Sequence, residues 1–135
     1  MRIYQDNGWK GDLYGTWKDM NELTKLIRSG LKEIAPGCKF SVTRRDNAVT
    51  VALMEAPEFP FCNKETPING ESIWRSSPVS AWFEPILNKI CDYLDSLNYD
   101  LGDPMRDYLD EAFYGFVQIG KWDKPFKVVK KEATI

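Results

Sequence analysis

The chain has 135 residues, of which 43% are hydrophobic and 13% aromatic, and its formal net charge is −2. This length and composition predict one domain over residues 1–135 with its own hydrophobic core, and no apolar run approaches the ~20 residues that span a bilayer. The absence of histidine excludes Ser-His-Asp and Cys-His nucleophilic systems. Three cysteines without a paired spacing and an N-terminus without an apolar signal-peptide centre lead us to expect a cytoplasmic protein with reduced thiols.

The first third of the chain predicts a strand followed by an amphipathic helix. Residues 2–5 read as an edge strand, and Thr16 followed by Asp19 resembles a helix-capping pattern. The helix should end at Pro36-Gly37, because proline cannot continue it and glycine tolerates left-handed dihedral angles. Apolar residues with a helical spacing define its buried stripe, namely Met20, Leu23, Ile27, Leu31 and Ile34. Gly30 is a weak point within this helix.

From residue 38 to residue 54 the apolar period changes from helical to two. This alternation predicts an antiparallel β-hairpin whose turn is Asp46-Asn47, since both residue types tolerate positive φ. Arg44 and Arg45 would then lie at the hairpin tip. The inward-facing positions are Cys38, Phe40, Val42, Val49, Val51 and Leu53.

The rest of the chain predicts a long connection and then mainly helix. Residues 55–78 form a connection longer than the ~12 to 15 residues usual in compact domains, so it is functional or contains a short element of its own. A second helix begins within residues 80–85, with an apolar stripe made by Phe83, Leu87, Ile90, Leu94 and Leu97. A short third helix over residues 104–112 and strands over residues 116–119 and 126–129 follow. We therefore expect an α+β fold in which two main helices pack on one face of a small antiparallel sheet, formed by the hairpin and a C-terminal strand or hairpin.

Charge is distributed unevenly along the sequence. Residues 1–54 carry nine basic and six acidic groups, residues 55–112 four and twelve, and residues 113–135 five and two. This asymmetry indicates a two-faced surface and a charged partner, although a solvated helix face would show the same charges.

Seven carboxylates fall within twenty residues of the acidic region. They could serve acid–base chemistry or cation binding, although no metal motif has this spacing. They could instead form a hydrated surface of a helix. A third alternative is that they imitate phosphates and bind the basic groove of a nucleic-acid-processing partner. The residues of this predicted partner-binding surface are Asp92, Asp95, Asp100, Asp103, Asp107, Asp110 and Glu111.

A second candidate site is basic. Phosphate contacts by cations, with stacking on interleaved Trp122 and Phe126, would bind nucleic acid. Lysine on an edge strand also discourages strand pairing, which is the plainer explanation. The candidate residues are Arg44, Arg45, Lys121, Lys124 and Lys127. Because the sequence has neither histidine nor a Gly-rich phosphate loop, we expect no catalytic site, cofactor or metal; an enzyme would have to rely on carboxylates or cysteine.

Residues 23–42, LTKLIRSGLKEIAPGCKFSV, and the following TRRDNAVTVALMEAP resemble the opening of a large polyvalent protein-associated domain of phages and conjugative elements. Ile27-Arg28, Leu31-Lys32, Pro36-Gly37 and residues 39–42 match the family pattern, whereas Ala35 replaces its usual aromatic residue. Residues 92–120 are similar to the acidic helix-turn and final strand of that family.

The resemblance implies a stand-alone mobile-element protein, such as an anti-CRISPR or anti-restriction protein. It would act in the cytoplasm of a bacterial host cell, where it would bind and inhibit a defence protein or nucleoprotein complex without catalysis and without contacting the membrane. The alternative is a nucleic-acid-binding accessory domain that uses the basic hairpin tip and the Lys-rich C-terminal segment.

Overall fold

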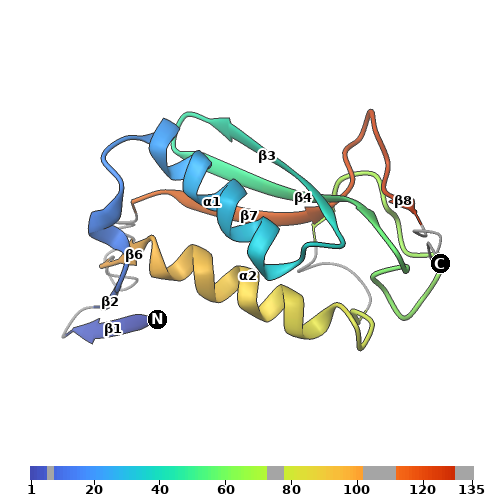
Figure 1. Cartoon of the computed structure of the whole chain (residues 1–135), viewed down its shortest axis with the longest axis horizontal. Coiled ribbons are helices and arrows are strands. Elements are labelled where there is room, and N and C mark those ends of the chain that lie inside the picture. The colour runs from blue at the N-terminus through green and yellow to red at the C-terminus, as the bar shows by residue number, and fades with distance from the viewer. Residues whose placement is uncertain (6–7, 73–77, 102–111, 130–135) are drawn as a thin grey trace, which may run out of the picture.

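A computed structural model describes residues 1–5, 8–72, 78–101 and 112–129 of the chain (Figure 1). The elements in chain order are β1 (Arg2–Gln5), β2 (Gly8–Gly11), a 3-10 turn (Tyr14–Thr16), α1 (Met20–Ile34), β3 (Lys39–Arg45), β4 (Ala48–Ala56), β5 (Glu71–Ser72), α2 (Glu84–Ser96), β6 (Tyr99–Asp100), β7 (Tyr114–Ile119) and β8 (Lys127–Val128). The α+β class is confirmed. The predicted helix over residues 104–112 lies outside the described residues.

The larger sheet is mixed, with strand order β3-β4-β7-β5 and β8 also paired to β4. The hairpin of β3 and β4 is antiparallel and turns at residues 46–47, as predicted, and Asp46 has a φ of +53°. The pairing of β7 and β8 with β4 is parallel, so the prediction of a wholly antiparallel sheet was wrong. The chain leaves β4, passes through α2, and returns in the same direction, as a parallel pair requires.

Both helices cover the same face of this sheet and contact each other (Figure 1). The predicted stripe of α1 faces inward: Leu23, Ile27 and Leu31 are buried, while Met20 and Ile34 pack at the edge of the core. All five apolar residues predicted for the α2 stripe are buried. The facing side chains of the sheet complete the core, and they are Val42, Val49, Val51, Leu53, Val117 and Ile119.

The first helix is capped by Asp19 and not by Thr16. The Asp19 carboxylate accepts a hydrogen bond from the backbone N–H of Glu22 at 2.8 Å, and the Glu22 carboxylate accepts one from the backbone N–H of Lys18 at 2.9 Å. This reciprocal arrangement satisfies two backbone donors at the start of the helix. Thr16 lies one turn earlier, where its hydroxyl donates to the carbonyl of Leu13.

Gly30 lies at the closest approach of α1 to Tyr93 of α2. A Cβ atom at residue 30 would lie 2.5 Å from Cζ of Tyr93 and 2.9 Å from its hydroxyl oxygen. That hydroxyl donates a 2.8 Å hydrogen bond to the carbonyl of Leu26, and burial, followed by the charge of Glu33, raises its pKa. Gly30 therefore permits a close helix–helix contact that its low helix propensity alone does not reveal.

A second, three-stranded sheet has the order β1-β2-β6. The strand predicted at residues 2–5 is confirmed, whereas its partner β2 was missed, because a four-residue segment with glycine at both ends carries little strand signal. Asn98, between α2 and β6, is buried and links this region to the start of β7. Its amide donates to the carbonyl of Phe113 at 2.9 Å, and its carbonyl oxygen accepts from the N–H groups of Ala112 and Tyr99.

The predicted long connection of residues 55–78 contains packed structure in its described part. Pro60 and Phe61 are buried in it, and β5 pairs with β7. Within the residues that the structure describes, no helix has the length and apolarity needed to cross a membrane.

Candidate functional site

The C-terminal strands β7 and β8 lie end to end along one edge of β4, separated by an excursion of the chain over residues 120–126. Gly120 begins the excursion with a φ of +68°, and a Cβ atom there would overlap the carbonyl oxygen of Ile68. Phe126 closes it, being buried and donating from its backbone N–H to the same carbonyl at 2.9 Å. Between them Lys121 and Lys124 form an antiparallel backbone bridge. The excursion is thus a fixed turn, anchored at both ends.

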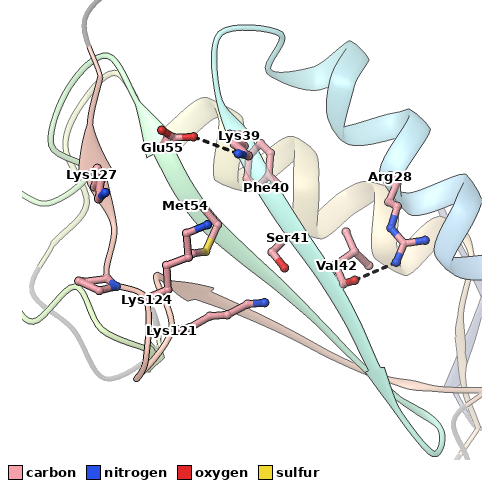
Figure 2. Close-up of a pocket in the computed structure, with 11 residues that line it drawn as sticks. Arg28, Lys39, Phe40, Ser41, Val42, Met54, Glu55, Lys121, Lys124 and Lys127 are labelled. Carbon is pink, nitrogen blue, oxygen red and sulfur yellow. Dashed lines mark hydrogen bonds and ion pairs between the residues drawn. The ribbon is translucent and has the colours of Figure 1, made fainter.

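This turn overhangs a pocket of about 470 Å³ that reaches from the edge of β3 to β8 (Figure 2). Among the described residues, the pocket is lined by five cationic side chains and a single carboxylate, that of Glu55. We call it the basic groove, and its cations are Arg28, Lys39, Lys121, Lys124 and Lys127. Neutral side chains, among them Ser41 and Met54, form its floor.

Strand register places three of the charged groups in one row. Lys39 is opposite Glu55 in the antiparallel pair, and Glu55 is opposite Lys127 in the parallel pair. The ammonium of Lys39 lies 3.4 Å from the Glu55 carboxylate, while a guanidinium nitrogen of Arg28 donates to the carbonyl of Val42 at 3.0 Å. These contacts orient the two cations on the β3 side without removing the positive excess of the groove.

The cations of the C-terminal side are less constrained. Across the described ranges, Lys121, Lys124 and Lys127 form no ion pair. Lys124 and Lys127 are exposed, whereas Lys121 is partly covered and extends from its turn toward β3 (Figure 2). Their charges are therefore available to an anionic ligand.

The two arginines predicted at the hairpin tip lie away from this groove. Arg44 donates to the carbonyl of Asp46 at 3.0 Å and to the side-chain oxygen of Asn21 at 3.3 Å. Arg45 is exposed at the far end of β3, six residues from Lys39 and hence about 20 Å along an extended strand. The structure thus separates the tip from the predicted C-terminal lysines and joins those lysines to Arg28 and Lys39, which sequence reasoning missed.

The structure also places the residues of the predicted acidic surface in different surroundings. Asp92 is exposed on α2, whereas Asp95 is 2.7 Å from the guanidinium of Arg2, which also stacks over the ring of Trp9. Asp100 lies in β6, opposite Trp9. The remaining members of the predicted acidic surface, Asp103, Asp107, Asp110 and Glu111, lie outside the described residues.

Two large aromatic side chains are exposed near the groove. Trp122, at the tip of the turn between Lys121 and Lys124, is 86% exposed, and Phe116 of β7 is 49% exposed. Because Val117 and Ile119 face the helices, the alternation along a strand places Phe116 on the opposite face of the sheet.

The three cysteines are free thiols that differ in exposure. Cys38 and Cys91 are half-buried, and burial raises the pKa of both thiols, with Asp95 and Asp92 raising that of Cys91 further. Cys62 is exposed, and its thiol donates to the carbonyl of Val79. Where the structure describes the chain, no three Cys, Asp or Glu side chains are grouped so that they could hold a metal ion.

Comparisons of the chain with models of known protein families, with curated proteins and with solved structures found no match. The resemblance noted from residues 23–57 and 92–120 is therefore a prediction that rests on those residues alone. The class that fold and site define is an α+β domain with a basic groove beside the sheet face opposite the helices.

Proposed function

We propose that this protein binds nucleic acid and holds a phosphate backbone in the basic groove. The observation that carries the proposal is the convergence of five cations from α1, β3 and the C-terminal segment on one pocket with a single carboxylate. Cations that neutralise phosphates release condensed counterions, and this release supplies most of the sequence-independent affinity for nucleic acid.

The composition of the groove favours a polyanion over a small anionic metabolite. Its volume of about 470 Å³ exceeds the needs of one phosphate, and its cations come from four places in the fold: α1, β3, the turn after β7, and β8. Four of the five are lysines, which act as mobile point charges and do not form the fixed fork with which arginine recognises one particular oxyanion. Such a surface follows a repeating chain of phosphates without specifying one compound.

Binding is tested by fluorescence anisotropy with labelled oligonucleotides over a range of salt concentrations. The double variant Lys124→Gln/Lys127→Gln should bind several-fold more weakly, and its plot of log affinity against log salt should be shallower by about 1.5, since each lost phosphate contact removes about 0.7 to 0.9 from the slope. Lys64→Gln/Lys89→Gln is the matched control, because both lysines are exposed, lie outside the groove and carry the same charge.

A variant of opposite sign sharpens the test. Glu55→Gln removes the only carboxylate of the groove and frees Lys39, so affinity should rise several-fold. Absence of binding by the wild-type protein at ~50 mM salt would overturn the proposal, as would equal losses in the groove variant and the control variant.

As a second candidate function we propose counter-defence: a phage or mobile-element protein that inhibits a host nucleic-acid-processing complex in the bacterial cytoplasm. The resemblance of residues 23–57 and the twelve acidic groups of residues 55–112 support this candidate, and Asp92 is exposed on α2. Purified CRISPR effectors and restriction enzymes would be assayed with and without the protein. Inhibition should weaken in Asp92→Asn and persist in the control Glu58→Gln; undiminished activity of every effector in the presence of the wild-type protein would exclude this function.

A further inference from the structure

Trp122 is the most exposed large apolar side chain that the structure describes, and its backbone lies in an anchored turn. The backbone N–H groups of Lys121 and Lys124 each donate to the other residue's carbonyl, at 2.8 and 3.1 Å, so Trp122 lies in a two-residue turn between them. Gly120 and Phe126 anchor the base of this turn against the connection that precedes β5. A rigid turn that presents an indole to solvent, while its two flanking lysines line the basic groove, places a stacking surface beside phosphate-binding charges.

Phe116 provides a second aromatic ring, on the sheet face that extends from the groove. Ser41, in the floor of the groove, is opposite Ala52, which in turn is opposite Gln118 of β7. The next row of the same face, two residues along each strand, ends at Phe116. Two residues of a strand span about 7 Å, so the half-exposed Phe116 lies one row along the strands and two strands across the sheet from Ser41.

Around Phe116 this face is polar, whereas Ala52 and Met54 of β4, farther along the same face, are buried. The row that ends at Phe116 contains Thr43 and Thr50, and Arg45 is exposed at the end of β3. The helices pack on the other face of the sheet. A flat face that carries hydroxyl groups, an aromatic ring and a cation matches the bases of an extended chain better than it matches an apolar protein surface.

We propose that the basic groove, Trp122 and Phe116 together bind single-stranded nucleic acid in preference to duplex, with bases stacked on the two rings. This inference rests on the proposed nucleic-acid-binding function and specifies its substrate class. Bases in a duplex are already stacked on one another and expose only their edges, whereas the bases of a single strand offer their faces to aromatic side chains. The rings of Trp122 and Phe116 can therefore stack on bases only when the bound nucleic acid is single-stranded.

The test compares labelled single-stranded DNA, single-stranded RNA and duplex DNA of equal length at ~50 mM salt, with the full chain. Wild-type protein should bind at least one single strand about tenfold or more tightly than duplex. Trp122→Ala should lower single-strand affinity about 5- to 150-fold, the range expected for one base–aromatic stack, and should leave duplex affinity within about twofold. Phe116→Ala should show a smaller loss of the same kind.

Two further variants separate stacking from structural effects. Trp122→Phe keeps an aromatic face and should retain most of the affinity, and Leu13→Ala removes an exposed apolar side chain that is not in the groove. Far-ultraviolet circular dichroism should be unchanged in all of them, because Trp122 and Phe116 are largely outside the core.

The outcomes separate the two proposals. Equal affinity for single strand and duplex, with no effect of Trp122→Ala, would overturn the single-strand inference and leave the basic groove as a duplex or general polyanion site. No binding to any of the three nucleic acids would overturn the proposed function itself, and this inference with it. A preference for DNA over RNA, or the reverse, would identify which single strand the groove accepts.

Discussion

The substitution Gly30→Ala should destabilise this protein, although alanine is the better helix former. In an open helix the change would stabilise the fold by about 1 kcal/mol. Here the new Cβ atom would lie 2.5 Å from Cζ of Tyr93, whose hydroxyl is fixed by its bond to the Leu26 carbonyl. Overpacking costs about 1 to 3 kcal/mol, and displacing the ring forfeits a hydrogen bond that contributes about 0.5 to 1.5 kcal/mol. We expect a net loss of about 1 to 3 kcal/mol.

The double-mutant cycle with Tyr93→Ala reverses the sign of this effect. Once the ring is absent, Gly30→Ala meets no obstacle and should stabilise the fold by about 1 kcal/mol relative to Tyr93→Ala alone. Urea unfolding followed by circular dichroism measures all four proteins. A stabilising effect of Gly30→Ala in the wild-type background would refute the packing argument, and an equal effect in both backgrounds would show that Tyr93 is not the obstacle.

Two more predictions concern buried polar and thiol groups. Asn98→Ala should lower the free energy of unfolding by about 2 to 4 kcal/mol in the same urea assay. The reason is that the backbone groups that Asn98 binds just before β7 would lose their partner inside the protein. A loss below ~1 kcal/mol would contradict this prediction. In native protein at pH 8, iodoacetamide should modify Cys62 first, since burial raises the pKa of Cys38 and Cys91 and restricts access to them. Labelling should become equal in urea, and equal rates in the native protein would show that burial does not protect the two thiols.

Local sequence patterns predicted where the helices and strands lie. They did not predict whether neighbouring strands run parallel or antiparallel. The two helical stripes and the alternation of β3 and β4 depend on side-chain periods that are visible in short windows, and they are the features that the structure reproduces. The direction of β7 depends on the path of the chain through α2, which no periodicity encodes. Gly30 shows the same limit, since only contact with Tyr93 gives a reason for a glycine within α1.

The composition of the candidate site was also only partly accessible from sequence. Lys121, Lys124 and Lys127 stand out as a local cluster, but nothing near Arg28 or Lys39 in the sequence links those residues to it. The link is the parallel pairing of β8 with the end of β4, which brings Lys127 and Lys39 to opposite sides of Glu55. The antiparallel sheet that the sequence predicted does not contain this pairing. It therefore gave no reason to expect these residues in one groove.

Protection of strand edges accounts for Lys39 and Lys127 but does not account for Lys121 and Lys124. Lys39 lies on the edge strand β3, and Lys127 lies on β8, which among the described strands pairs with β4 alone, so both could serve to discourage strand addition. Lys121 and Lys124 belong to a turn, where there is no edge to protect. A lysine retained only for solubility would extend freely into water, yet Lys121 is partly covered and reaches across the groove. Because like charges that converge in this way weaken a fold, binding of an anion gives them a role that edge protection does not.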